Sequence, residues 1–294
     1  MNPIRVQGAL FSVVAFGLSV ASIFIERSDS MSQLTTIAVL IFILGVPHGA
    51  LDPLFAGKLF PIEDAKNWFK FFFYYVFLAT LVIGLWMLYP VLFMFFFLAM
   101  STLHFSRDLN PQTPFTTKLL YGGAAIVLPN LLHSSNMSSL FSIILGSQNS
   151  ELVIRILVLI APAWILLLLC AIFIEFKRDR AQALEMSALT LMAICAQPLI
   201  AFTAYFCLMH SIRHILRAQK YLLVSWGQML VTAIWPMAIV GLVVYMSWGW
   251  GWGWGWGWGW PDSEYSRTIQ FIYVGLAALT LPHVLLIDRI NYHE

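Results

Sequence analysis

The sequence predicts an all-α integral membrane protein: a polytopic helix bundle of about ten transmembrane helices, forming a single transmembrane domain over residues 1–294. Composition is the first reason, because 60% of the residues are hydrophobic and 10% are charged, whereas about 25% of a soluble domain is charged. The second reason is that apolar stretches of about 20 residues, long enough to cross a bilayer, recur from end to end. They leave no room for a soluble domain between them.

Ten candidate spans follow one another along the chain. Pro90 and Pro198 divide two long apolar stretches, because the residue before a proline is disfavoured in a helix, and polar segments make the other breaks. Both proline breaks are short and uncharged, so either stretch could be divided differently. The spans cover roughly residues 7–25, 34–55, 70–89, 90–107, 117–134, 152–175, 181–197, 198–217, 222–247 and 267–287.

The basic residues predict how these spans are oriented, because cytoplasmic loops carry an excess of Lys and Arg. If the N-terminus is cytoplasmic, thirteen of the sixteen basic residues fall on the cytoplasmic side, and the other side holds Arg27, Arg155 and Arg267. We therefore expect a multi-pass protein of the cell membrane with both termini in the cytoplasm. The cytoplasmic set comprises Arg5, Lys58, Lys66, Lys70, Arg107, Lys118, Lys177, Arg178, Arg180, Arg213, Arg217, Lys220 and Arg289.

Charge and cysteine content exclude some classes of function. The net charge of +2 is small and there is no basic tract, so no nucleic-acid partner is expected. Cys170, Cys195 and Cys207 are scattered through apolar runs without Cys-x-x-Cys spacing, which favours inert packing. Arg213 and Arg217 are expected to be anchors whose charged ends reach the membrane interface.

Four histidines are predicted to share one depth in the membrane. His48 lies late in the second span, His104 late in the fourth, and His210 and His214 late in the eighth. All three spans run from outside to inside, so the four rings should lie in the cytoplasmic third of the bilayer. His283, near the end of the tenth span, has a similar depth and is a secondary candidate.

The spacing of these residues indicates a metal site. His210 and His214 are four residues apart, which places them on one helix face, so both can bind one ion. Each of the other two histidines is followed at the same interval by an aspartate, Asp52 or Asp108. A metal-bound imidazole usually donates its second N–H to a carboxylate or carbonyl. The aspartates are candidates for that role, or alternatively are interfacial residues that flank helix ends.

An isolated histidine inside a membrane is more often a packing residue than a ligand, but four at one depth favour a metal, since ionisable groups within a membrane are functional candidates by default. Imidazole suits Fe, Zn, Cu or Ni, and a structural zinc site would more typically include thiolates. Four neutral imidazoles around an octahedral metal leave two open positions, which suits Fe(II) and O2. His133, at the opposite face, is not expected to take part.

Four segments resemble the Brp/Blh family of membrane β-carotene 15,15′-dioxygenases: GVPHGALD (45–52), STLHFSRD (101–108), CLMHSIRH (207–214) and GLAALTLPH (275–283). The match runs in order from about residue 40 to the C-terminus. The resemblance implies an enzyme that cleaves the central double bond of β-carotene with O2 to give two molecules of all-trans-retinal. It also implies an Fe(II) cofactor held by histidines.

Carried over by position, the resemblance implies that His48, His104, His210 and His214 are the iron ligands, the same four that the depth argument selects. His283 also falls in a family-like motif. Enzymes of this family accompany bacterial and archaeal rhodopsins, so a functional association with a rhodopsin is implied as well.

An apolar polyene substrate should enter laterally from the lipid bilayer into a tunnel walled by apolar and aromatic side chains. The aromatic runs 71–75 and 93–97 are candidate walls, or alternatively lipid-facing and packing residues. Because the four histidines lie nearer one face while a carotenoid is about as long as the hydrocarbon core is thick, about 30 Å, we expect a tilted or nearly in-plane substrate.

One segment departs from the resemblance. Residues 248–260 alternate seven tryptophans with six glycines and would form the outer loop between the ninth and tenth spans. Indole rings favour the bilayer interface, so we expect a tolerated low-complexity loop on the outer headgroup layer. Contact with a lipid or carotenoid is the alternative.

Other functions remain open on the sequence. A membrane desaturase or related di-metal oxidase would need further histidine boxes, and only His210 with His214 matches part of that pattern. A membrane transporter should distribute polar groups across the bilayer, whereas these cluster on one side. An inactive partner of a rhodopsin would not need the complete histidine set.

Overall fold

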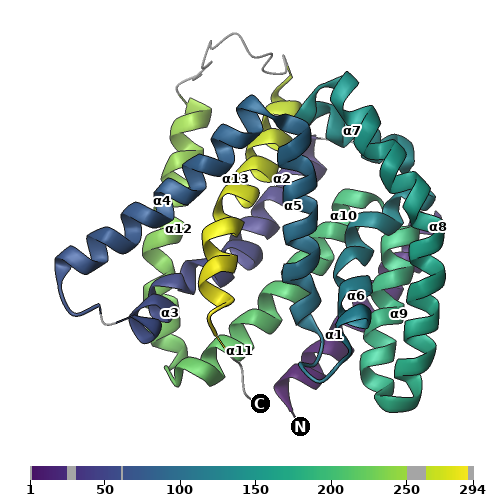
Figure 1. Ribbon diagram of the computed structural model, residues 1–294, viewed down its shortest axis with the longest axis horizontal. Coiled ribbons are helices and arrows are strands. Elements are labelled where there is room, and N and C mark those ends of the chain that lie inside the picture. Colours follow the sequence, from purple (N-terminus) through teal and green to yellow (C-terminus); the bar gives the residue numbers. More distant parts are fainter. Residues whose placement is uncertain (1, 25–30, 61, 250–262, 291–294) are drawn as a thin grey trace.

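The computed structural model describes residues 2–24, 31–60, 62–249 and 263–290, and within these ranges every regular element is helical (Figure 1). The prediction of an all-α fold is therefore confirmed. The α-helices are α1 (Pro3–Phe24), α2 (Met31–Leu40), α3 (Asp52–Leu59), α4 (Ala65–Leu88), α5 (Pro90–Phe105), α6 (Phe115–Val127), α7 (Ser134–Leu145), α8 (Ser147–Arg178), α9 (Arg180–Cys195), α10 (Pro198–Ala204), α11 (Ile212–Leu222), α12 (Trp226–Gly249) and α13 (Glu264–Ile287). The Gly-Trp repeat lies outside the described residues, except for Trp248 and Gly249 at the end of α12.

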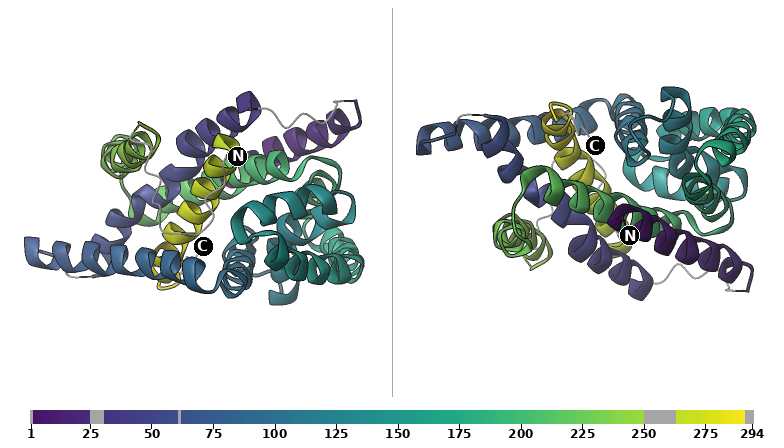
Figure 2. Two further views of the ribbon diagram at one scale, coloured as in Figure 1. Left: turned by 90° about the horizontal axis from the view of Figure 1, so that it is seen from above. Right: turned by 90° about the horizontal axis from the view of Figure 1, so that it is seen from below.

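Helices from distant parts of the chain pack side by side. α1 lies along α9, which also packs against α6 and α8, while α13 packs against α4 and α7. The start of α1 and the end of α13 lie at the same end of the bundle, the lower end in Figure 1. α12 stands at the periphery in all three views (Figures 1 and 2), where it packs mainly against the segment around His48.

Seven helical segments of the described chain are long and apolar enough to cross a membrane. The number rises to eight if Phe115–Leu131 and Ser134–Leu145, bent by 108° relative to each other, count as one span. These findings support a polytopic membrane bundle, but with fewer such segments than the predicted ten.

One predicted span falls short of the length that crosses a membrane. The span 222–247 is not the short one, because α12 has 24 residues, within which Trp226–Leu242 is found as a shorter apolar helix. For 181–197, α9 has 16 residues and reaches about 24 Å at 1.5 Å per residue, against a hydrocarbon core of about 30 Å. Because α9 is largely enclosed by α1, α6 and α8, it does not need the length of a helix that faces lipid.

The two aromatic runs have different surroundings. In α4 the buried residue is Val82, and the run 71–75 mostly faces outward, on a surface suited to lipid. In α5 the run 93–97 places Phe93 and Phe97 in the core. Residues 72–74 of the first run therefore suit lipid contact, and Phe93 and Phe97 of the second suit packing, while Tyr75 at the end of the first run is half-buried.

Helical geometry changes near the candidate histidines. The π-helix η1 (Ile41–Gly45) and the 3-10 helix η2 (Val46–Leu51) precede α3, the 3-10 turn η3 (Ser106–Asp108) ends α5, and the π-helix η5 (Tyr205–Ser211) joins α10 to α11. Short π segments occur frequently at functional sites. A Cβ on Gly45 would lie 2.5 Å from Cε1 of Phe206, so glycine is needed for the close packing of η1 on η5.

Candidate metal centre

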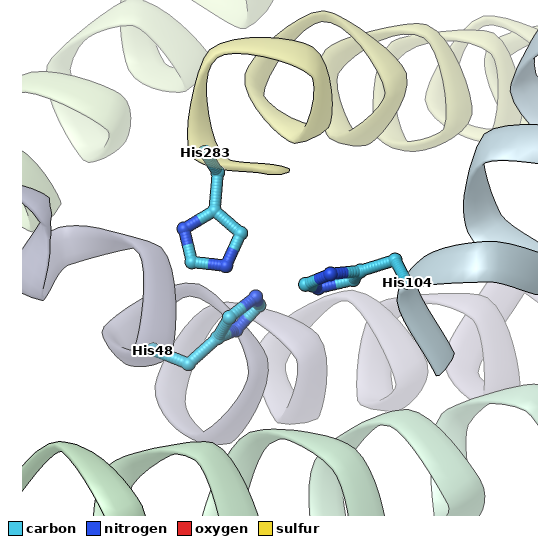
Figure 3. Close-up of side chains that lie close together, drawn as sticks. All are labelled: His48, His104 and His283. Carbon is cyan, nitrogen blue, oxygen red and sulfur yellow. The ribbon is translucent and has the colours of Figure 1, made fainter. Parts of the chain in front are cut away.

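Five histidines from four helical segments meet inside the bundle. They are His48 in η2, His104 near the end of α5, His210 and His214 in the continuous η5–α11 segment, and His283 in α13. All five are buried, with exposed fractions between 2% and 8%. Figure 3 shows the rings of His48, His104 and His283 pointing toward one another from three separate elements.

The rings lie close enough to share one ion. One ring nitrogen from each of His48, His104 and His283 lies within 4.8 Å of the others. The ring centroid of His210 is 4.6 Å from that of His104 and 5.2 Å from that of His48, and the centroids of His214 and His283 are 5.0 Å apart. Nitrogen ligands about 2.1 Å from one metal lie at most about 4.2 Å apart, so small ring movements would bring the nitrogens of His48, His104 and His283 onto a common ion. His210 and His214 lie beside this group of three.

Three of the five histidines have an acceptor at Nδ1. His210 Nδ1 lies 3.0 Å from Asp108 Oδ1, and His283 Nδ1 lies 2.7 Å from Asp52 Oδ1. His48 Nδ1 contacts the backbone carbonyl three residues before it. A carboxylate or carbonyl at the second nitrogen is the usual arrangement for an imidazole that binds a metal.

Other ring nitrogens of the cluster are buried without partners. Within the described part of the chain, the buried Nε2 atoms of His104, His210, His214 and His283 have no hydrogen-bond partner, and neither have the Nδ1 atoms of His104 and His214. Buried polar atoms nearly always have one, and a cation is the group that several neutral imidazole nitrogens can satisfy together. The donor set therefore fits a metal ion that prefers imidazole.

The four candidate ligands taken from the sequence lie together in this cluster, and His283 lies among them rather than apart from them. Its depth and its motif were the available signals. What sequence reasoning could not see is the contact with Asp52, which joins residues 231 positions apart. His133 makes a different contact, with its Nε2 3.2 Å from the carbonyl oxygen of Cys195.

The two aspartates contact histidines other than those expected from spacing. Asp52 pairs with His283, not with the histidine four residues before it, and Asp108 pairs with His210. The cause is local geometry: both aspartates end or directly follow 3-10 segments, where three rather than 3.6 residues complete a turn. A residue four positions on then no longer shares the face of the histidine.

Each aspartate also accepts a hydrogen bond from a tyrosine that sequence reasoning did not identify. Tyr75 Oη of α4 donates to Asp52 Oδ2 over 2.8 Å, and Tyr205 Oη of η5 donates to Asp108 Oδ2 over 2.7 Å. No spacing signal marks either tyrosine, because each reaches its partner from another helix.

Arg213 does not extend to the interface as expected from the sequence. Its side chain is 3% exposed and forms an ion pair with Glu185, with Nη1 2.9 Å from Oε2. Nη1 also donates to the backbone oxygen of Asp108 over 2.9 Å. An arginine reaches the interface only where its path is open, and here α1 and α9 cover it.

Aromatic side chains surround the histidines. The Phe206 ring is stacked on His210 at 5.8 Å between centroids and meets His48 edge-on at 5.3 Å. Phe105 lies 4.9 Å from His210, and Phe55 lies 5.7 Å from His214. These apolar walls keep water from the cluster and suit an apolar reactant.

Comparisons with known proteins give one consistent result. A family model described as Beta-carotene 15,15'-dioxygenase matches residues 39–291. A curated protein named Beta-carotene 15,15'-dioxygenase, from Uncultured marine bacterium 66A03, is 29% identical over 265 residues, covering 86% of this chain and 92% of that protein. No solved structure matches the chain significantly.

Proposed function

The chain belongs to the β-carotene 15,15′-dioxygenase family, and we propose that the five-histidine cluster is its active site and holds one ferrous ion. The chain is a carotenoid-cleaving oxygenase built as a membrane helix bundle. Its reaction breaks the central double bond of β-carotene, and each of the two carbons becomes the aldehyde carbon of one retinal as the oxygen atoms of O2 are added. Family membership favours this activity over a transporter or a desaturase-like enzyme.

The observation that carries the proposed site is the set of buried Nε2 atoms without partners, from His104, His210, His214 and His283. His48 completes the ring of imidazoles, with its centroid 5.0 Å from that of His283. When bound there, ferrous iron would supply the activation of O2. An all-imidazole donor set supports iron over structural zinc, which would more typically have thiolate ligands.

The protein side chains orient the ligands and exclude water. Asp108 and Asp52 accept the Nδ1 protons of His210 and His283, which leaves the Nε2 lone pairs directed inward. Tyr205 and the other aromatic residues around the cluster make its walls apolar. We propose that these walls hold the central double bond of β-carotene beside the histidines, because positioning decides which bond is cleaved.

We propose that both termini are cytoplasmic in the cell membrane. The excess of Lys and Arg on one side supports this orientation, and so does the location of the start of α1 and the end of α13 at the same end of the bundle (Figure 1). β-Carotene would then enter from the lipid phase. A rhodopsin that takes up the retinal product is the functional partner that we propose.

Expression in cells that accumulate β-carotene tests the proposed site. We expect retinal to appear and the carotenoid to be consumed, and His48→Ala, His104→Ala, His210→Ala and His214→Ala each to abolish retinal formation. His133→Ala is the matched control and should retain it, since that ring contacts Cys195 instead.

Metal analysis of the purified protein completes the test. We expect one iron per chain in the wild type and in His133→Ala, with loss of iron in the four ligand variants. Retinal formation that survives complete removal of iron, or equal damage from His133→Ala, would contradict the proposal.

A further inference from the structure

The helix that carries His104 and Asp108 ends abruptly, directly after the site. Asp108 is the last residue of η3, and Leu109 is extended, with φ −73° and ψ 167°. The last carbonyl groups of a helix lack partners within it, and here two of the residues that carry them, Asp108 and Leu109, are buried. A mobile helix end would therefore displace both a ligand and the acceptor of His210.

Two arginines supply the missing donors. Arg213 Nη1 donates to the Asp108 carbonyl over 2.9 Å. Arg217 Nη2 donates to the carbonyls of Asp108 and Leu109 over 3.2 and 3.3 Å, and its Nη1 contacts the carbonyl of Arg107. Arg213 lies between His210 and His214 on the same helical segment. Its hydrogen bond to the Asp108 carbonyl therefore joins the segment of these two histidines to the helix of His104.

Arg213 is held in turn from two other helices. Glu185 of α9 accepts from Nη1 over 2.9 Å, and Gln7 of α1 accepts from Nε over 2.9 Å. Arg213 and Glu185 are 3% and 6% exposed. A buried ion pair generally adds little net stability compared with apolar packing, so its presence beside the histidines points to a role in positioning.

Helix α1 contacts Arg213 and the segment before His210. It does so although it precedes residues 39–291, the part of the chain matched by the family model. Gln7 Nε2 donates to the carbonyl oxygens of Leu208 over 2.7 Å and Met209 over 3.3 Å, in the π-helix directly before His210. The next residue, Gly8, permits this approach: a Cβ there would lie 1.7 Å from Oε1 of Glu185.

We propose that Arg213, held by Glu185 and Gln7, is a positioning residue for the metal centre. It fixes the end of the helix that carries His104 and Asp108 against the segment that carries His210 and His214. It thereby sets the distance between His104 and the pair His210 and His214, and α1 is part of the metal-binding machinery. The inference rests on the proposed function, because it concerns the iron ligands of that site.

A matched pair of substitutions in α1 tests the proposal without removing a charge. Gly8→Ala displaces the Glu185 carboxylate, while Gly17→Ala adds the same methyl group to the same helix where a Cβ meets nothing within 4 Å. We expect Gly8→Ala to weaken Fe(II) binding about 10-fold or more, the size typical for the outer partners of metal ligands. Gly17→Ala should bind Fe(II) as the wild type does.

The second variant, Arg213→Lys, keeps the charge but has a single donor nitrogen in place of Nε, which donates to Gln7, and Nη1, which donates to Glu185 and the Asp108 carbonyl. We expect weaker Fe(II) binding and altered absorption bands of the Co(II)-substituted protein, which report ligand geometry independently of activity. The dissociation constant of Fe(II) is measured by chelator competition in folded, detergent-solubilised protein.

The outcomes separate this inference from the proposed function. If the wild type binds no iron, the proposed function fails. If the wild type binds iron and both Gly8→Ala and Arg213→Lys bind it with unchanged affinity and unchanged Co(II) spectra, the positioning role fails and the proposed function stands. A melting temperature lowered equally in Gly8→Ala and Gly17→Ala, with equal affinities, would also overturn the positioning role.

Discussion

Asp52 and Asp108 stand at the centres of two groups with the same side-chain arrangement. Each buried carboxylate accepts from one histidine Nδ1 and one tyrosine hydroxyl, His283 and Tyr75 for Asp52 and His210 and Tyr205 for Asp108. The difference lies in the backbone beneath them. Asp52 begins α3, whose turns continue to Leu59, whereas Asp108 closes a helix whose end carbonyls have no partner within it.

The backbone carbonyl groups around the two aspartates find their hydrogen-bond donors in different places. Around Asp52 the continuing helix satisfies the carbonyl groups, and the group is built from α3, α4 and α13. Around Asp108 the carbonyls require donors from elsewhere, and these come from Arg213 and Arg217 of α11, with Gln7 and Glu185 holding Arg213. Similar chemistry at two ligands thus depends on local structure in one case and on long-range contacts in the other.

The largest expected effect tests whether the two groups serve one ion. His210→Ala and His283→Ala should each reduce kcat/KM for β-carotene by about 100-fold or more and lower the iron content, because each removes a ring with an inward Nε2. Retinal formation by chromatography and iron per chain are the measurements. Full iron content and wild-type kcat/KM in His283→Ala would show that His283 and its partner Asp52 take no part in the site.

The next largest effect on the metal site is expected from replacing the two carboxylates. Asp108→Asn and Asp52→Asn keep the side-chain shape but lose the negative acceptor, so iron affinity should fall about 10–100-fold in each. Chelator competition measures the change. Equal losses would show that the two acceptors act alike, and an unchanged affinity in either variant would show that its histidine needs no carboxylate.

Removing the ion pair between Arg213 and Glu185 should affect the Asp108 group and leave the Asp52 group unchanged. Arg213→Ala leaves Glu185 buried and unpaired, which should cost about 3–5 kcal/mol of stability. The double variant Arg213→Met/Glu185→Leu should recover most of the melting temperature, because well-packed apolar residues can replace a buried pair, but not the iron affinity. Recovery of both would mean that the pair only fills space.

The smallest effects belong to the tyrosines. Tyr205→Phe and Tyr75→Phe each remove one hydrogen bond to a carboxylate, worth about 1.5–3 kcal/mol, and leave the histidines in place. Tyr205 is 0% exposed and Tyr75 is half-buried, so thermal unfolding should show the larger loss for Tyr205→Phe. The reverse order would show that burial does not decide the value of the two bonds.

Much of the fold follows from the sequence because the bilayer imposes strong rules on it. Apolar runs marked the helices, and each predicted span overlaps a helix, but the predicted span 117–134 covers only the first part of the bent pair and α7 was not predicted. The number of segments long enough to cross a membrane differed, since α9 is enclosed by neighbouring helices and need not match the bilayer thickness. Hydropathy measures composition and carries no information about such enclosure.

The residue types of the candidate site could also be proposed from the sequence, but not the hydrogen bonds between them. Depth and spacing placed His48, His104, His210 and His214 together, and a His-x3-His pair is a local feature of one helix. The partners could not be assigned, because 3-10 turns moved Asp52 and Asp108 off the faces of their nearest histidines.

The sequence by itself determined the membrane class, the approximate helices and the residue types available for binding a metal ion, since these depend on composition and on short-range periodicity. Only the tertiary structure decided that His283 joins the cluster, that each aspartate serves a histidine from another helix, and that Arg213 is buried. The physical reason is that these contacts join residues 28 to 231 positions apart, and which distant helices become neighbours is decided by packing of the whole bundle.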